Sequence, residues 1–272
     1  MTREQIILSY IKRDGLGLEI GAGCAPIAPK KQGFRVHVLD HCDKKALIEK
    51  YRPHGTNVDN IEEVDFVWDG RSYTELIGRR HVYDWVIGSH VLEHTTDLIG
   101  FLNDCDPCYA RMGCFHSQYR IAGFVSIVFG QSPESGGSLT LRRQKIHSPG
   151  SCVEYFLTVV KKGARLAWSP GPGEKDDYAF VHSIAEEKKA LGDVGEGNAY
   201  LDIHKWCFTP NSFRLMMRDL FELGLVQLKE PSFHPPVGHE FYMTLSRRGQ
   251  LPRESRLELM QRVLEEQAAT CR

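Results

Sequence analysis

A pair of glycines directly after an apolar run could hold part of a nucleotide-like ligand. Residues Leu16–Ile20 read as a short buried strand that runs into Gly21 and Gly23. Without a Cβ atom, the backbone can turn sharply there and approach a ligand closely. The next apolar run, 35–39, ends on Asp40, and an acid at about this distance from the turn is where a ribose diol is bound. The spacing therefore predicts a ligand that contains ribose.

The acid Glu19, two positions before the first glycine, bears on the charge of that ligand. Its carboxylate would repel a pyrophosphate but attract a cationic group, such as the amino group of a methionine moiety, directly or through water. Pro26 and Pro29 also stand close together where a helix should begin, which disfavours a phosphate bound at a helix N-terminus. The pattern favours a ligand with a cationic amino group.

Two segments carry a resemblance to a known family. Residues 19–23, EIGAG, are similar to the acid-x-Gly-x-Gly turn of the class I S-adenosylmethionine-dependent methyltransferases, with Ala25 rather than glycine as the third small residue. Residues 83–87, YDWVI, followed by 90–94, HVLEH, are similar to the fourth-strand motif of that family. The resemblance covers residues 16 to about 104 and implies S-adenosyl-L-methionine as the cofactor.

The same resemblance implies roles for individual residues. It would place Asp69 near the adenine amino group of the cofactor and Ser89 near its methionine part. The cofactor-binding residues that we predict are Glu19, Gly21, Gly23, Asp40, Asp69, Ser89 and His90.

Strands and helices alternate along the first part of the chain. Helical patterns at 3–13, 44–51 and 72–77 alternate with strand-like runs, including 64–68 and 81–89. This alternation predicts an α/β fold with a doubly wound, mostly parallel sheet, whose ligands bind beyond the carboxyl ends of its strands. The predicted site residues that stand at such ends are Asp40, Asp69 and Ser89.

The second half of the chain should complete this sheet. A helix that starts at Thr209–Pro210 and stops at Gly224 leads to two strand-like runs, 225–228 and 240–245. We expect these runs to form a C-terminal antiparallel strand pair at the sheet edge. Further helices are indicated at 152–162, ended by Gly163, and at 183–191.

The predicted elements divide the chain into four parts. They are a cofactor-binding α/β core at 1–145, an insertion or lid contributing to the substrate site at 146–205, the completion of the sheet at 206–250 and a peripheral C-terminal helix at 251–272.

His182 and His204 are the best isolated candidates for a catalytic base. A hydroxyl acceptor has to lose its proton as a methyl group moves, and histidine titrates in the useful pH range. The cysteines that flank the cofactor loop, Cys24 and Cys42, have no neighbour in the sequence that would activate a thiol. We therefore predict His182 and His204 as the catalytic residues.

The run HVLEH allows more than one interpretation. His90, Glu93 and His94 would share one face of a helix, and H-x-x-E-H is a zinc-protease signature. Here the run follows a sheet strand instead of lying within a long helix, so a protease is disfavoured. A metal-assisted methyltransferase remains an alternative, but the favoured interpretation is hydrogen-bonded packing at a helix start, and we predict no metal ligand. A second possible zinc set has Cys105-x-x-Cys108 with Cys114 and His116 but lacks a second tight pair.

The segment from about 107 to 136 does not supply the helix end and turn that should precede a fifth strand. Read one base out of frame with permitted codons, PCYARMGCFHSQYRI becomes LLRADGVLSLSIPD, which contains a helix end, a turn and a strand that resembles the fifth strand of the family. We hypothesise a compensated frameshift in this segment, which would alter part of the substrate wall. In the sequence as it stands, 121–129 is the apolar run able to fill a central strand position, whereas 115–120 is polar and charged.

Composition excludes several classes of protein. The chain is 42% hydrophobic and 25% charged with a formal net charge of −1, which gives no electrostatic case for a nucleic-acid partner. No run approaches membrane-spanning length and the N-terminus lacks a signal-peptide core. Eight cysteines without secretory targeting predict reduced thiols in the cytoplasm.

These observations predict an S-adenosylmethionine-dependent methyltransferase that methylates oxygen or nitrogen of a small-molecule or glycan-type acceptor. We expect no nucleic-acid or membrane partner, and the oligomeric state is not predicted. An alternative is a catalytically silent binding protein that keeps the fold. A nicotinamide-dependent oxidoreductase is disfavoured by Glu19 and by the terminal antiparallel pair.

Overall fold

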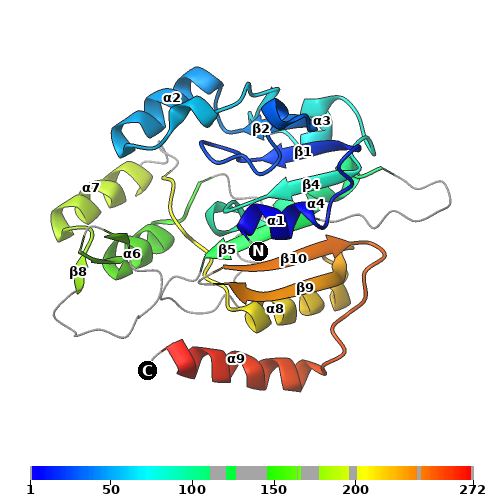
Figure 1. The fold of residues 1–272 in the computed structure, drawn as a ribbon. Coiled ribbons are helices and arrows are strands. Elements are labelled where there is room, and N and C mark those ends of the chain that lie inside the picture. Colours follow the sequence, from blue (N-terminus) through cyan, green and yellow to red (C-terminus); the bar gives the residue numbers. More distant parts are fainter. Residues whose placement is uncertain are drawn as a thin grey trace.

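A seven-stranded sheet forms the centre of the described part of the protein, in the order β3-β2-β1-β4-β5-β10-β9 (Figure 1). The computed structural model describes residues 2–110, 121–126, 146–163, 165–166, 178–195, 201–237 and 240–270. The strands of this sheet are β1 (Leu16–Ile20), β2 (Arg35–Asp40), β3 (Phe66–Val67), β4 (Trp85–Gly88), β5 (Ile121–Ser126), β9 (Lys229–Val237) and β10 (Glu240–Ser246).

The first five strands run in the same direction, and β10 is the strand of this sheet that runs in the opposite direction. β1 pairs in parallel with β2 and β4, β2 with β3, and β4 with β5. β10 runs antiparallel to both β5 and β9. The predicted doubly wound, mostly parallel sheet with a C-terminal antiparallel strand pair is confirmed, and the fold is Rossmann-like. The strand order reverses at β1 and β4, which is where such sheets bind ligands.

The two central strands, β1 and β4, are buried on both faces of the sheet. Successive side chains of β4 point to opposite faces. Val86 packs with Leu18 in the largest apolar cluster of the described residues, while Trp85 packs with Ile6 and Ile7 in a second cluster. Gly17 of β1 has to lack a side chain, because a Cβ atom there would lie 2.1 Å from the Trp85 ring.

Helices cover both faces and supply the segments around the strand ends. α1 (Arg3–Leu8) brings the Ile6 and Ile7 side chains to one face of the sheet. The helices between the strands are α2 (Lys44–Tyr51), α3 (Tyr73–Ile77) and α4 (Leu98–Cys105). The short 3₁₀ turns are η1 (Lys30–Gln32), η2 (Arg52–His54), η3 (Val58–Asn60), η4 (Leu92–His94) and η5 (Asp106–Cys108). None of the helices described is both long enough and apolar enough to cross a membrane.

The C-terminal helices follow the sequence closely. α8 (Pro210–Glu222) begins at Thr209, whose hydroxyl accepts a hydrogen bond from the Ser212 backbone N–H, and Gly224 follows its end with a positive φ of 71°. This start and stop confirm the prediction. α9 (Arg256–Thr270) packs against α8 through Leu259 and Val263.

The described residues between 149 and 195 build a smaller unit at one end of the molecule (Figure 1). It contains α6 (Pro149–Thr158), α7 (Ile184–Gly195) and a small sheet in the order β7-β6-β8. The strands of that sheet are β6 (Val160–Lys162), β7 (Arg165–Leu166) and β8 (Tyr178–Phe180). The predicted helix at 152–162 is wrong at its end. The β-branched pair Val159 and Val160 ends the helix in favour of a strand, and Gly163 makes the following turn with φ of 60°.

The penultimate strand also differs from the prediction at 225–228. β9 starts at Lys229 and runs through three prolines, at positions 231, 235 and 236. Proline cannot donate a ladder hydrogen bond and is tolerated mainly in edge strands. β9 is an edge strand of this sheet, with β10 as its neighbour, so its three prolines are compatible with its position.

The fifth position of the sheet is occupied by Ile121–Ser126, between β4 and β10. This strand comes from the apolar run at 121–129, as the sequence favours for the chain as it stands. The run at 115–120 lies outside the described residues. The frameshift itself stays a hypothesis, which the gene sequence through this segment would test.

Candidate functional site

The turn after β1 has a backbone conformation that favours glycine at both positions. Gly21 and Gly23 have positive φ angles of 66° and 48°, in the left-handed region that other residues avoid. A Cβ atom on Gly21 would lie 2.7 Å from Val91 Cγ2, and one on Gly23 would lie 3.1 Å from the Tyr51 hydroxyl. The Gly21 N–H donates to the Leu39 carbonyl at 2.9 Å. The turn is thus packed tightly between β2 and the segment that follows β4.

Glu19 orders the loop that follows this turn. Its side chain is only 2% exposed, and its two oxygens accept hydrogen bonds from the backbone N–H groups of Ile27 at 2.6 Å and Ala28 at 3.0 Å. Burial raises the pKa of Glu19 to about 7, although these two hydrogen bonds act to lower it. Because both carboxylate oxygens accept hydrogen bonds from the backbone, Glu19 would act on a ligand indirectly. It sets the shape of the loop and contributes its charge.

The pKa of Glu19 predicts a stability that falls as the pH rises. The folded-state pKa is raised from 4.5 to about 7, so this contribution to stability is fully present below the unfolded pKa and is lost as the pH rises through about 7. One pKa unit corresponds to about 1.4 kcal/mol. Between about pH 4.5 and about pH 8, we therefore expect the free energy of unfolding of the wild type to fall by about 3 kcal/mol relative to that of Glu19→Gln. Chemical denaturation of both proteins measures this difference, and a difference that does not change with pH would contradict it.

Asp40 lies beside the glycine turn, as the spacing predicts. It ends β2, is 4% exposed, and accepts a hydrogen bond from the Gly23 N–H through Oδ2 at 3.3 Å. Its Oδ1 accepts from the His41 N–H at 2.8 Å and lies 2.6 Å from His41 Nδ1. Each carboxylate oxygen has two lone pairs, so Asp40 has capacity left for hydroxyl donors of a ligand.

Two consecutive residues after β4 have unusual environments. The buried Oγ of Ser89 has no hydrogen-bond partner among the described residues, a state that costs about 1–3 kcal/mol unless a ligand or water satisfies it. His90 has a positive φ of 54°, and such outliers cluster at functional sites. Its Nδ1 lies 3.1 Å from Glu93 Oε1 and its Nε2 lies 2.8 Å from Glu240 Oε1. Burial alone would lower the pKa of His90, but these two carboxylates outweigh it and raise that pKa to about 9.

Asp69 has a different environment from the other predicted cofactor residues. It follows β3, and its side chain is 46% exposed. The Arg71 Nε–H donates to its two oxygens at 3.1 and 2.8 Å, and this partner lowers the pKa of Asp69. The described contacts therefore link Asp69 to its own turn and not to the glycine turn.

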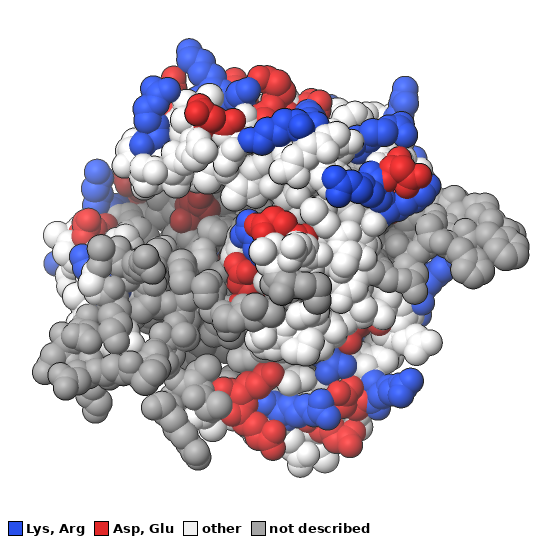
Figure 2. All heavy atoms as spheres, in the orientation of Figure 1, with Lys and Arg blue, Asp and Glu red and all other residues white. Residues whose placement is uncertain are grey.

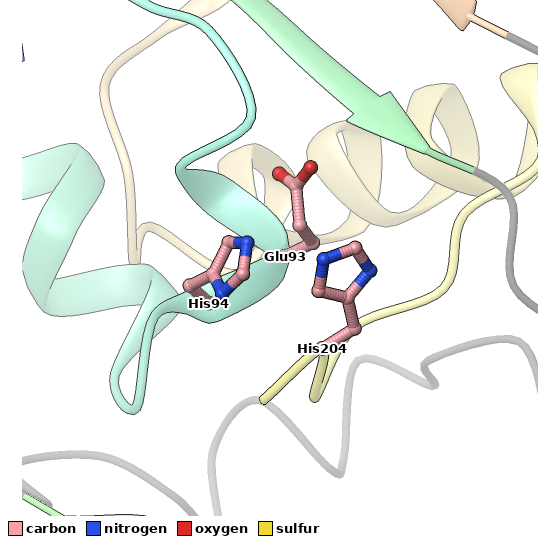
Figure 3. A group of neighbouring side chains, drawn as sticks. All are labelled: Glu93, His94 and His204. Atoms are coloured by element: carbon pink, nitrogen blue, oxygen red, sulfur yellow. The ribbon is translucent and has the colours of Figure 1, made fainter. Parts of the chain in front are cut away.

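Glu93, His94 and His204 form a cluster that only the folded chain brings together (Figure 3). Glu93 and His94 come from η4, and Glu93 is 0% exposed. The backbone N–H groups of Lys205 and Trp206 donate to the Glu93 carbonyl at 2.8 and 3.2 Å, which fixes the segment at 201–209 against η4. The rings of His94 and His204 meet edge to face, with centroids 4.4 Å apart and planes at 84°.

The electrostatic surroundings of this cluster extend to α2. Asp202 Oδ1 lies 2.8 Å from His94 Nδ1, and Asp202 Oδ2 accepts from Lys50 Nζ at 2.8 Å. The hydrogen bond to His94 is the largest influence on Asp202 and holds its pKa well below the usual range. Burial, followed by the neighbouring His94, lowers the pKa of His204 to about 4. His204 is therefore a neutral imidazole at pH 7.

The two histidines predicted as bases both neighbour the ring of Tyr155. Tyr155 of α6 has its ring centroid 6.3 Å from that of His204 and 5.9 Å from that of His182. His182 also packs against Phe156, with centroids 4.4 Å apart. The described contacts place His204 within the cluster and His182 beside it. Sequence reasoning missed Tyr155, Lys50 and Asp202, for which no local pattern gives a signal.

Comparisons with known proteins find the fold but no close relative. No family model and no curated protein matches the chain. A SAM-dependent methyltransferase from Aquifex aeolicus is similar over 89% of this chain and 88% of its own, with 9% identity and a TM-score of 0.44. A putative S-adenosyl-L-methionine-dependent methyltransferase from Methanococcus maripaludis is similar over 92% and 85%, with 12% identity and a TM-score of 0.38.

A structure described as a putative zinc-dependent alcohol dehydrogenase from Rhodobacter sphaeroides is similar over 90% of this chain and 89% of its own, with 14% identity and a TM-score of 0.41. Likeness at this level concerns the arrangement of strands and helices. The reaction has to be argued from the side chains of this protein.

Proposed function

We propose that the protein is an S-adenosylmethionine-dependent methyltransferase that methylates oxygen or nitrogen of a small-molecule or glycan-type acceptor. The observation that carries the proposal is the meeting of the glycine turn, Asp40 and Ser89 at the carboxyl ends of β1, β2 and β4. This is the edge where the strand order reverses and where ligands of doubly wound sheets bind.

The residues at this edge fit the cofactor that the fold implies. Gly21 and Gly23 allow the left-handed turn that places this backbone at the carboxyl end of β1, where the cofactor would lie. Asp40 would accept hydrogen bonds from the ribose hydroxyls, and the buried Ser89 Oγ would gain the partner it lacks by hydrogen bonding to the methionine part. When bound, S-adenosylmethionine supplies an electrophilic methyl group.

The acceptor would be deprotonated beside η4, the turn that follows β4. His204 is neutral at pH 7 and lies beside Tyr155 of the smaller unit, so it is suited to receive a proton from an acceptor hydroxyl. His182, on the same tyrosine ring, is the second candidate. The acceptor class is supported by charge. The net charge is −1, and Figure 2 shows acidic and basic side chains interspersed among the described residues of the face it draws, which gives no electrostatic argument for a nucleic-acid acceptor.

We expect the protein to bind S-adenosylmethionine and S-adenosylhomocysteine in calorimetry, and Asp40→Ala to weaken both by about 10- to 100-fold. This loss is the magnitude of one or two hydrogen bonds to a charged acceptor. Asp59→Ala, which removes an exposed carboxylate, is the matched control for loss of charge and should bind as the wild type does. Binding of NAD without binding of S-adenosylmethionine would refute the proposal. Cofactor binding without methyl transfer to any acceptor would instead indicate a silent binding protein.

A further inference from the structure

We propose that Glu93, His94 and His204 bind a divalent first-row transition-metal ion, with Zn²⁺ as the representative. One oxygen and two imidazole nitrogens, one from each residue, lie within 4.8 Å of one another. Ligand atoms about 2.0–2.2 Å from a zinc ion are separated by up to about 4 Å, so small side-chain rotations would close the set. Imidazole with carboxylate is a donor combination that suits zinc and its neighbours in the first transition row.

The carboxylate of Glu93 is the observation that points to a cation. Its side chain is 0% exposed. Oε1 lies 3.1 Å from His90 Nδ1, whereas the buried Oε2 has no hydrogen-bond partner in the described part of the chain. His90 divides its two ring nitrogens between Glu93 and Glu240, so it can offset at most one of these two carboxylates. A buried carboxylate oxygen without a partner is costly, and a metal ion between Glu93 and the imidazoles would provide one.

The surroundings of His94 match those of a metal-bound histidine. Histidines that bind metal through one ring nitrogen usually donate the other N–H to a carboxylate, which fixes the ring and its tautomer. His94 Nδ1 lies 2.8 Å from Asp202 Oδ1, so the ion would be bound by Nε2. Asp202 is itself held by Lys50 Nζ at 2.8 Å. Asp202 would therefore be a positioning residue for the proposed ion.

His204 is brought to the same place by the backbone of the residues that follow it. Lys205 and Trp206 donate backbone hydrogen bonds to the Glu93 carbonyl, and the Trp206 indole N–H donates to the Thr95 carbonyl at 2.7 Å. These three bonds attach the segment at 201–209 to Glu93 and Thr95, at the C-terminal end of HVLEH. A ligand set with two members on η4 and the third on this segment would thus be preorganised by the fold.

The function of such an ion rests on the proposed methyltransferase activity, while its binding does not. Three protein ligands leave coordination positions open, as in catalytic zinc sites. A hydroxyl group of an acceptor that binds there would have its pKa lowered and would lose its proton to water more readily. The site therefore favours a hydroxyl-bearing acceptor, and the methylated atom would be oxygen.

Metal binding by the full-length protein tests the proposal directly. Calorimetry with Zn²⁺, after removal of metal with a chelator, is expected to show one ion per chain. Glu93→Gln and His204→Gln should weaken binding by more than about 100-fold, and Asp202→Asn by about 10- to 100-fold, the range for residues that orient a ligand. His54→Gln, at an exposed histidine of η2, is the matched control and should bind as the wild type does.

Cobalt distinguishes this site from the cysteines of the chain. Co²⁺ bound by nitrogen and oxygen should give visible bands without the near-ultraviolet charge-transfer band of a thiolate ligand. A thiolate band, or equal Zn²⁺ affinity in the wild type, Glu93→Gln and His204→Gln, would overturn the proposal. Thermal unfolding without metal shows whether each variant folds. If Glu93→Gln does not fold, the Zn²⁺ affinity of His204→Gln decides the test. S-adenosylmethionine binding by the same samples separates the two proposals. Zn²⁺ binding without cofactor binding would support the metal site alone, and cofactor binding without Zn²⁺ binding would support the methyltransferase alone.

Discussion

Replacing Gly21 with valine is expected to weaken S-adenosylmethionine binding by about 100-fold or more, while the same replacement at Gly33 leaves the affinity unchanged. Both glycines have positive φ angles, 66° and 84°, so both substitutions strain the backbone by about 1–2 kcal/mol. They differ in the space available. A Cβ atom at Gly21 would lie 2.7 Å from Val91 Cγ2, whereas at Gly33 nothing lies within 4 Å.

Comparing Gly21→Val with Gly33→Val separates the effect of a clash within the turn from the effect of the backbone strain that both substitutions cause. Val91 is β-branched and has few rotamers to move into, so the clash at Gly21 has to displace either the turn or the segment after β4. Calorimetry with the cofactor and thermal unfolding of both variants measure the two effects separately. If Gly33→Val lost affinity to the same extent, the loss would come from destabilisation, and the turn would have no special part in binding.

The parts of the site that could be predicted from sequence are those fixed by one strand and its neighbour. β1 begins and ends where the apolar run does, and Asp40 ends β2. Parallel neighbours have their carboxyl ends at the same edge, so Gly23 and Asp40 had to approach each other, and a hydrogen bond now joins them. Burial on both faces similarly made β4 visible as a continuous apolar run.

The metal-binding candidates could be predicted only in part, because their arrangement depends on contacts between distant residues. Glu93 and His94 stand out in HVLEH, but their association with His204 depends on hydrogen bonds such as the one from Trp206 to Thr95, 111 residues away in the sequence. Nothing local in the sequence specifies that pairing. Lys50 and Asp202, which form a salt bridge, are 152 residues apart in the sequence, and no local pattern predicts their pairing either.

Errors in the predicted elements have local physical causes. The end of α6 was misplaced because a glycine at 163 looked like a helix stop, while the β-branched residues before it prefer a strand. The strand predicted at 225–228 is the apolar run directly after Gly224, whereas β9 begins at Lys229 and contains three prolines, which are unusual in a strand. The position of β9 at the sheet edge, which accommodates these prolines, is a property of the whole sheet and not of the segment.

His204→Ala is expected to lower kcat by about 100-fold or more and to leave the dissociation constant of S-adenosylmethionine nearly unchanged. His204 belongs to the cluster with Glu93 and His94, and its ring also lies beside that of Tyr155 in α6. Its loss removes a group that receives the acceptor proton or holds an ion that acidifies the acceptor, so the effect falls on turnover.

His182→Ala is the matched comparison, because both histidines contact the ring of Tyr155. His182 has described ring contacts with Tyr155 and Phe156 and lies outside the cluster, so we expect a smaller loss of kcat than for His204→Ala. Steady-state kinetics with a methylated acceptor, together with calorimetry for the cofactor, measure both variants. A larger loss of kcat in His182→Ala than in His204→Ala would assign the role of base to His182. Undiminished turnover in both variants would mean that methyl transfer here needs neither imidazole.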